Sequence, residues 1–168
     1  ENLEFADIVR GSNEDFEVIY KLNDADKVYH SEISFYCKNF ICTRGKGPIS
    51  VHAEGNFHKD YDIESLKTVS TIGAGDTFNA GFIYGLLRQH ITRDDIQNGL
   101  TEAQWDSLIA SGKAFSAECC KDIYNYVGKE FGLLKKQELW LYDDDFAKIQ
   151  RLSSVLRREK RLFNEWKV

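Results

Sequence analysis

Apolar and polar residues in the first part of the chain predict strands that alternate with helices. The segment 6–9 predicts a short buried strand, after which Ser12 or Asn13 is placed to cap a helix. A second helical stretch at 27–38 leads into the apolar run 39–43, which ends at a glycine-containing turn. The first helix is predicted to carry three side chains on one face: Phe16, Ile19 and Tyr20.

The next segment alternates with a period of two, which predicts a β-hairpin. Its strands are 49–53 and 57–61, joined by a short Glu-Gly-Asn turn. Apolar residues then keep helical spacing at 78–87, 105–119 and 146–156. The last of these helices starts with acidic and ends with basic residues, which suits a helix dipole better than a binding patch. Strand–helix alternation followed by helices predicts an α/β fold with a largely parallel sheet.

Length and composition narrow the class of protein. The chain has 168 residues, of which 42% are hydrophobic, so we expect one compact domain over residues 1–168. Its 22 basic and 27 acidic side chains give a net charge of −5, which gives no electrostatic basis for binding a nucleic acid backbone. No apolar run approaches the roughly 20 residues that span a bilayer. We therefore expect a cytoplasmic protein with neither nucleic acid nor membrane as partner.

Sulfur-containing residues add two expectations. The four cysteines have neither C-x-x-C nor zinc-ligand spacing, so they are interpreted as buried thiols. The chain contains no methionine, even at position 1, which leads us to expect a fragment of a longer protein. The cysteines are Cys37, Cys42, Cys119 and Cys120.

The segment 70–83 holds the strongest chemical signal. Gly73 and Gly75 precede an amphipathic helix, so that consecutive backbone amides face one spot at the positive helix end, where a phosphate fits. A Walker A lysine is absent, and Asp76 stands there instead. An aspartate in this place suits a base that takes a proton from an attacking hydroxyl while the amides hold the phosphoryl group. The alternative is that Asp76 only caps the helix.

This run resembles the C-terminal signature of the PfkB, or ribokinase-like, carbohydrate kinase family, and 73–80 is especially similar to its ketohexokinase branch. The resemblance implies the C-terminal portion of a three-layer α/β/α sandwich. It also implies ATP-dependent phosphorylation of a hydroxyl on a small sugar or sugar-like substrate. Under it, Asp76 is the catalytic base, and Gly73, Ala74 and Gly75 form the anion hole.

Two further segments resemble nucleotide-binding parts of the same family. Thr43, Gly45 and Gly47 match a strand end whose backbone lies beside the nucleotide phosphates, with a plain turn as the alternative. Ser111 and Gly112 match a small-residue helix that packs under adenine. Close helix–helix packing explains those two small residues equally well.

A metal site is implied near the first helix. The segment around Asn13 resembles the family's N-x-x-E motif, which orders Mg²⁺ near the phosphates. Phe16 occupies the glutamate position, so that Glu14 or Glu17 would take over the metal-binding role. An acidic N-cap turn is the alternative. Ser70 stands where the family has an Asp that helps to hold a monovalent cation, which leaves that cation's place in this chain open.

The resemblance covers residues 6–120, which correspond to the C-terminal half of such an enzyme. The missing half would supply most sugar-binding groups and the lid, so we expect the isolated chain to be silent in catalysis. An unpaired sheet edge leads us to expect that it is also poorly soluble or oligomeric. The alternative function is a kinase-derived module that binds nucleotide or a protein partner without catalysis.

Overall fold

The computed structural model describes residues 2–64 and 68–141. The chain divides into two compact units, Glu1–Val127 and Gly128–Val168, and the single domain expected over residues 1–168 stays a prediction. The sheet and most helices belong to the first unit, and α6 (Lys129–Leu141) belongs to the second. The predicted helix at 146–156 lies outside the described residues.

A four-stranded sheet of order β1-β2-β3-β4 forms the centre of the first unit. β1 and β2 are parallel, whereas β2–β3 and β3–β4 are antiparallel. The prediction of a largely parallel sheet is therefore wrong for the described strands. The connection between β2 and β3 is too short for a crossover, so it returns the chain antiparallel. The strands are β1 (Val9–Ser12), β2 (Phe40–Thr43), β3 (Ile49–Ala53) and β4 (Phe57–Tyr61).

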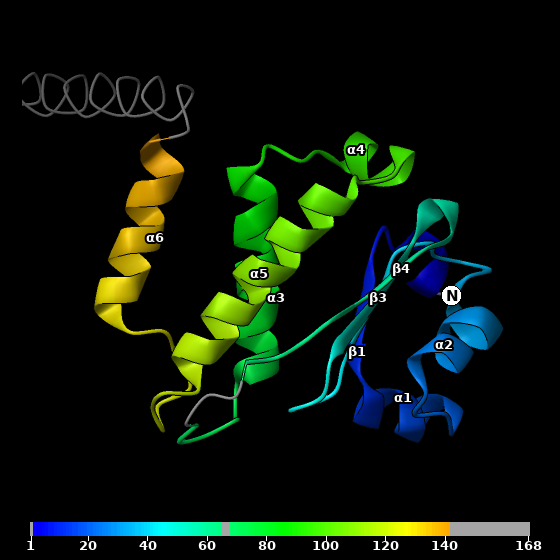
Figure 1. Ribbon diagram of the computed structural model, residues 1–168, viewed down its shortest axis with the longest axis horizontal. Coiled ribbons are helices and arrows are strands. Elements are labelled where there is room, and N and C mark those ends of the chain that lie inside the picture. Colours follow the sequence, from blue (N-terminus) through cyan, green and yellow to red (C-terminus); the bar gives the residue numbers. More distant parts are fainter. Residues whose placement is uncertain (1, 65–67, 142–168) are drawn as a thin grey trace, which may run out of the picture. The chain divides into compact units, whose positions relative to one another are not determined.

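Short helices cover one face of the sheet (Figure 1). They bury Phe16, Val28 and Ile33 against Phe40 and Cys42 of β2, whereas Ile19, which was predicted on the buried face, is exposed. The stretch predicted at 27–38 begins earlier and ends in a π-helical turn. The helices are η1 (Asn2–Phe5), α1 (Asn13–Tyr20), α2 (Ala25–Val28) and η2 (Tyr29–Ile33).

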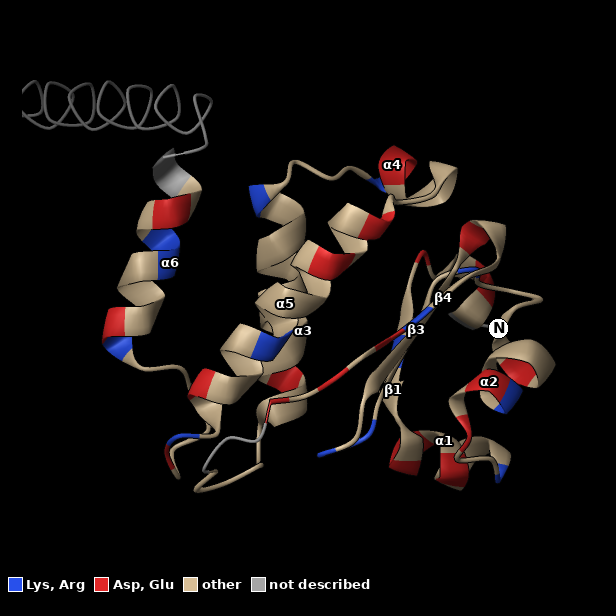
Figure 2. Ribbon diagram, in the orientation of Figure 1, with Lys and Arg blue, Asp and Glu red and all other residues tan. Residues whose placement is uncertain are grey.

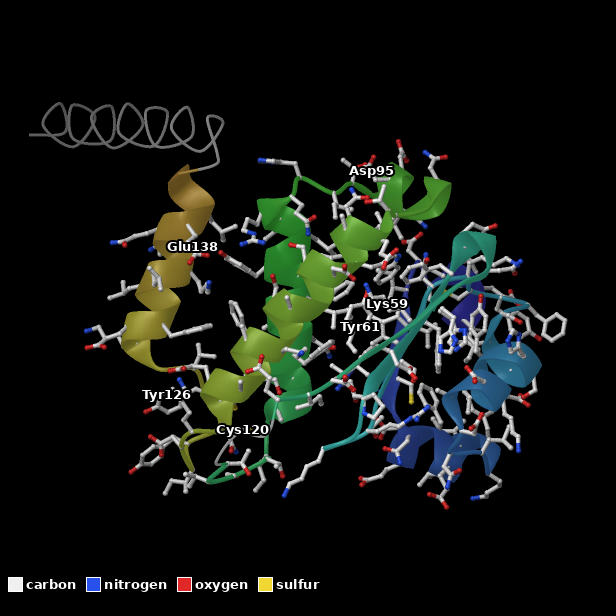
Figure 3. The ribbon with its side chains drawn as sticks, viewed as in Figure 1. Lys59, Tyr61, Asp95, Cys120, Tyr126 and Glu138 are labelled. Carbon is white, nitrogen blue, oxygen red and sulfur yellow. The ribbon has the colours of Figure 1, made fainter. Side chains whose placement is uncertain are left out.

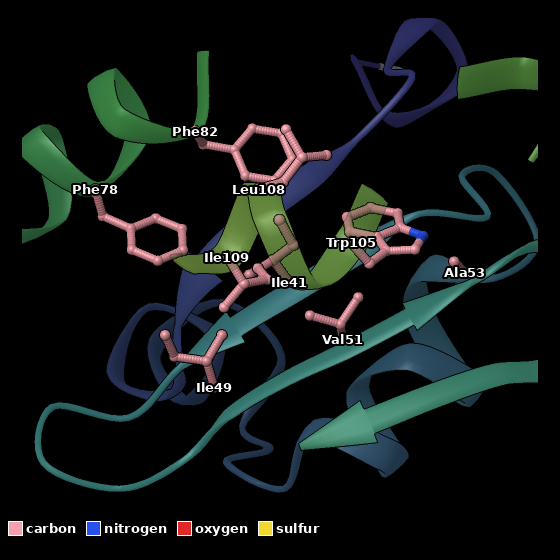
Figure 4. Close-up of a cluster of buried hydrophobic side chains, with 9 residues drawn as sticks. All are labelled: Ile41, Ile49, Val51, Ala53, Phe78, Phe82, Trp105, Leu108 and Ile109. Atoms are coloured by element: carbon pink, nitrogen blue, oxygen red, sulfur yellow. The ribbon is translucent and has the colours of Figure 1, made fainter. Parts of the chain in front are cut away.

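The opposite face of the sheet packs against two long helices. Trp105, Leu108 and Ile109 of α5 are fully buried in this core and face β2 and β3 (Figure 4). Helices on both faces make the three-layer arrangement that the resemblance implies. The remaining elements of this unit are η3 (Glu54–Asn56), α3 (Ala74–Arg88), α4 (Arg93–Asn98) and α5 (Glu102–Cys119).

Polar contacts join β4 to α5, and Figure 3 labels Lys59 and Tyr61, the β4 side chains that make them. The Lys59 ammonium lies 2.7 Å from carboxylate oxygens of both Glu102 and Asp106, and the Tyr61 hydroxyl donates to Asp106 at 2.8 Å. These contacts hold the edge of the hairpin on the helical layer. All four cysteines are free and buried, as predicted. Within the described ranges, no helix combines the length and the apolar character needed to cross a membrane.

Candidate active site

The start of α3 carries the Gly-Ala-Gly-Asp run. Gly73 caps the helix in the left-handed conformation, with φ of 78°, which a residue with a side chain rarely adopts. Its carbonyl accepts from the amide of Thr77 at 2.9 Å, and the amide of Ala74 donates to the carbonyl of Thr71 at 3.2 Å. The first-turn amides of Gly75 and Asp76 have no acceptor within the helix. They remain open to an anion, and the Asp76 side chain beside them is exposed.

The end of α5 holds the loop that leads to this helix. The amide of Val69 donates to the carbonyl of Cys120 at 2.8 Å, and the Cys119 thiol donates to the carbonyl of Ile72 at 3.7 Å. The hydroxyl of Ser70 accepts from the amide of Ile72 at 3.2 Å, so this side chain supports the turn. A Cβ on Gly73 would lie 3.2 Å from Cβ of Asn125, so the chain is closely packed at the helix start.

The Arg10 side chain extends from the middle of β1 to the start of α3. Its two terminal guanidinium nitrogens lie 3.1 Å from the point where a Cβ of Gly75 would be. One of them donates to the Thr43 hydroxyl at 3.1 Å, and the guanidinium stands 5.5 Å from the centre of the Phe78 ring. Within the described part of the chain, Arg10 Nε is buried without a hydrogen-bond partner. Arg10 therefore connects Thr43 at the end of β2 with the start of α3.

Two carboxylates interact with this guanidinium. Burial lowers the pKa of Arg10, and the charges of Asp15 and Asp76 oppose that shift. An arginine keeps its charge even so. Asp15 is part of a capping box with Ser12, whose amide and hydroxyl lower the pKa of the Asp15 carboxyl. The site thus combines one fixed positive charge, two carboxylates and a helix start, and Figure 2 shows the acidic residues of the neighbouring α1.

The glycines predicted beside the nucleotide phosphates lie in the turn after β2. Gly45 has a φ of 55°, and the amide of Gly47 donates to the carbonyl of Arg44 at 2.7 Å. Thr43 lies at the strand end and touches Arg10. The phosphate-binding role of Gly45 and Gly47 stays a prediction.

Ser111 and Gly112 lie in the contact between α3 and α5. The Ser111 hydroxyl donates to the carbonyl of Ser107 at 2.9 Å. A Cβ on Gly112 would come within 2.7 Å of the Phe78 ring, and one on Gly81 within 2.5 Å of the Ser111 carbonyl oxygen. Close helix packing, the alternative named from the sequence, accounts for both small residues. Their role beneath adenine stays a prediction.

The predicted metal-binding residues lie in α1. Glu14 and Glu17 are exposed, and Asn13 is half-buried at the helix start. Phe16 is buried against Gly11, where a Cβ would come within 2.6 Å of its ring, so this residue is fixed in the core. Asp15 is the acidic residue of α1 whose charge acts on Arg10.

Sequence reasoning missed Arg10 and Asp15. A signal for each is present in the sequence. Arg10 directly follows the strand predicted at 6–9, and a charged side chain next to a buried strand calls for a partner. Ser12 and Asp15 have the spacing of a capping box, which fixes the direction of the Asp15 side chain.

A helix start with open amides, an adjacent aspartate and an arginine from the neighbouring strand defines a candidate phosphoryl-transfer site on an α/β/α fold. The pfkB family of carbohydrate kinases matches residues 1–122 of this chain. The chain belongs to that family.

Curated relatives match a smaller part of the chain. The 5-dehydro-2-deoxygluconokinases of Bacillus thuringiensis (strain Al Hakam) and Bacillus cereus (strain 03BB102) are 32% identical to it over 91 residues. That match spans 51% of this chain and 27% of each relative. The chain thus covers about a quarter of the length of these enzymes.

Solved structures share the fold. Fructokinase from Vibrio cholerae O395, bound to fructose, ADP and calcium, is 17% identical, with a TM-score of 0.63 over 84% of this chain and 42% of its own. Aminoimidazole riboside kinase from Salmonella enterica, bound to its riboside and an ATP analogue, is 18% identical. Its TM-score is 0.58 over 72% of this chain and 38% of its own. At these identities the likeness establishes the ribokinase-like fold alone.

Proposed function

We propose that this chain carries the nucleotide and base machinery of a kinase that transfers the γ-phosphoryl group of ATP to a hydroxyl of a small sugar or sugar-like molecule. The observation that carries the proposal is the start of α3. There, the exposed carboxylate of Asp76 stands beside amides without an intrahelical acceptor and opposite Arg10. Family membership supports the same reaction class.

The chemistry follows from the charges at this helix start. Asp76 accepts the proton of the substrate hydroxyl, whose oxygen forms a bond to the γ-phosphorus while the bond to the bridging oxygen of ADP breaks. Of the anion hole predicted from Gly73, Ala74 and Gly75, the Ala74 amide donates to the Thr71 carbonyl. The amides of Gly75 and Asp76, together with the Arg10 guanidinium, therefore stabilise the negative charge of the transferring group. Because Arg10 is already held by Thr43 and by the Phe78 ring, it needs little reorganisation to do so.

Magnesium fits the carboxylates at the start of α1. Mg²⁺ binds through one or two carboxylates plus phosphate oxygens, and the exposed oxygens of Glu14 and Glu17 are donors of this kind. Asn13 at the helix start, and Asp15 beside Arg10, are the other oxygen donors of this turn. When bound, the ion supplies positive charge that neutralises the phosphates. The Ser70 hydroxyl supports the turn before α3 by accepting from the amide of Ile72. The proposed reaction therefore assigns it no monovalent cation.

The substrate class rests on the relatives. Their names describe a deoxygluconate derivative, fructose and a riboside, which share a hydroxylated carbon skeleton. ATP as donor agrees with the cytoplasmic location expected from the sequence.

A second candidate function is nucleotide binding without catalysis. The place of Ser70 in the turn favours it, because the family's carboxylate that helps to hold a monovalent cation beside the anion hole is replaced by a hydroxyl engaged with the backbone. A coupled ADP-release assay of the protein that carries this chain, against ketoses, aldoses and nucleosides, separates the two. The kinase proposal predicts turnover with at least one substrate. ATP binding without turnover across the panel would favour the silent module instead.

A further inference from the structure

Three of the four histidines of the chain gather on the face of the sheet opposite α3. His52 of β3 and His58 of β4 are direct cross-strand partners, and their rings stack at a centroid distance of 4.3 Å with an interplanar angle of 4°. His30 of η2 meets the His52 ring edge-on at 5.8 Å. Histidines are scarce in this sequence, so their gathering calls for an explanation.

Asp26 of α2 completes this group. Its Oδ1 lies 2.9 Å from Nε2 of His52 and 3.6 Å from Nε2 of His58. The three ligand atoms all lie within 4.8 Å of one another. Within residues 2–64 and 68–141, no other group of three or more His, Cys, Asp and Glu side chains is close enough to share a metal ion.

The inner member of the group is a buried imidazole whose Nε2 lacks a hydrogen bond. His52 is 3% exposed, and its Nε2 has no hydrogen-bond partner, although Asp26 Oδ1 is within reach. The two atoms are close but not aligned for a hydrogen bond. A neutral imidazole has one protonated and one bare nitrogen, and a bare Nε2 facing a carboxylate oxygen offers two ligand atoms to one cation.

We propose that Asp26, His52 and His58 form a binding site for a divalent transition metal ion of the zinc class. Zinc binds imidazole nitrogen and carboxylate oxygen at about 2.0–2.2 Å, which places tetrahedral ligand atoms roughly 3.3 Å apart. The observed 2.9 and 3.6 Å lie on either side of that value. The Asp26 side chain is 58% exposed and the His58 side chain is 43% exposed, so water completes the coordination. Mg²⁺ is a poor fit because it prefers oxygen ligands.

The position of the site gives it a structural role. Val51 belongs to the core beneath α3 and α5, so the adjacent His52 points to the other face, where Tyr29 stacks on it at 4.4 Å. A bound ion would join α2 to the hairpin β3–β4, because Asp26 comes from the helix and both histidines from the hairpin. α2 and α3 lie on opposite sides of the sheet (Figure 1), so this site is separate from the proposed phosphoryl-transfer site.

Zinc binding to the protein that carries this chain, after treatment with a chelator, tests the proposal by calorimetric titration and by thermal unfolding. We expect a single Zn²⁺ per chain and a higher unfolding temperature in its presence, because an ion that binds only the folded state stabilises it. His58→Phe keeps a ring stacked on His52, and Asp26→Asn keeps the shape of the carboxylate. Each is expected to weaken zinc binding by about 100-fold or more and to remove the shift in unfolding temperature. Without ATP, whose phosphates complete the magnesium site proposed at α1, Mg²⁺ should produce no shift.

His90→Asn is the matched control, since His90 is exposed outside the group and an asparagine tolerates its positive φ of 51°. It should bind zinc like the unaltered chain. Equal zinc binding in all four proteins would overturn the proposal, because another group, such as the cysteines, would then hold the ion. Absence of zinc binding and of any thermal shift in the unaltered chain would overturn it as well.

Discussion

Arg10 occupies the space that Gly75 leaves open by having no side chain. Both terminal guanidinium nitrogens lie 3.1 Å from the position of a Cβ on this glycine. The contact brings a positive charge from β1 directly to the helix start where Asp76 is exposed, and a side chain at the second position of α3 would make the guanidinium shift.

Gly75→Ala is expected to displace Arg10 and to weaken ATP binding by roughly tenfold, the loss of about one charge-assisted hydrogen bond. Stability should change little, since the end of a flexible side chain moves. Calorimetric titration with ATP and a thermal melt measure both effects. Gly132→Ala, in α6, has nothing within 4 Å of the new Cβ and serves as control. An unchanged ATP affinity in Gly75→Ala would show that Arg10 does not contact the phosphates.

Replacing Arg10 itself separates its charge from its shape. Arg10→Lys keeps the charge but loses the planar fork that reaches Thr43, whereas Arg10→Gln loses both. We expect ATP affinity to fall in both variants, and by roughly 10- to 100-fold in Arg10→Gln. Arg93→Gln, on exposed α4, removes the same charge elsewhere and should leave ATP binding unaltered. Equal losses of ATP affinity in Arg10→Gln and Arg93→Gln would show that the effect comes from the net charge of the protein and not from the position of Arg10.

Tyr61 makes the free energy of unfolding depend on pH in the alkaline range. Burial, and the hydrogen bond and charge of Asp106, raise the pKa of its hydroxyl above the ordinary value of 10. Above pH 10 the unfolded chain therefore loses this proton while the folded chain keeps it, so the free energy of unfolding falls as pH rises. Urea unfolding at pH 9 to 11 should show this decline, and Tyr61→Phe should flatten it. Tyr36→Phe, at an exposed phenol, should keep the slope of the unaltered chain.

The contact between α3 and α5 depends on Gly81. A Cβ there would lie 2.5 Å from the carbonyl oxygen of Ser111 and 2.8 Å from Cβ of Phe115, so backbone would have to move. Gly81→Ala is expected to cost about 1–3 kcal/mol of stability despite its better helix propensity. Gly132→Ala, again without close neighbours, should not lower the free energy of unfolding. A fully stable Gly81→Ala would mean that the two helices are not packed as described.

Local pattern predicts much of this fold. The hairpin β3–β4 follows from alternation and a short turn, and α5 follows from the spacing of Trp105, Leu108 and Ile109. Strand direction does not follow from such a pattern. The mixed sheet arises because the segment 44–48 is too short to cross over, a property of connection length rather than of strand composition.

The candidate site, like the fold, is predicted from the sequence only in part. The Gly73–Asp76 run is contiguous, so its helix start is visible in the sequence alone. Arg10 belongs to the site through contacts with residues more than 30 positions away, such as Thr43, which single-sequence reasoning does not reveal. The same holds for Asp26, His52 and His58, whose spacing matches no metal motif and which only the fold brings together.

The role of Asp76 as catalytic base is the central claim, and Asp76→Asn tests it most directly. The measurement is kcat, in the protein that carries this chain, together with ATP affinity by calorimetric titration. Asparagine keeps the shape but cannot accept the proton, so we expect kcat to fall by about 10²–10⁴ while ATP binding stays nearly intact. Asp94→Asn, at an exposed aspartate in the first turn of α4, should leave both quantities unchanged. Unaltered turnover in Asp76→Asn would contradict the account.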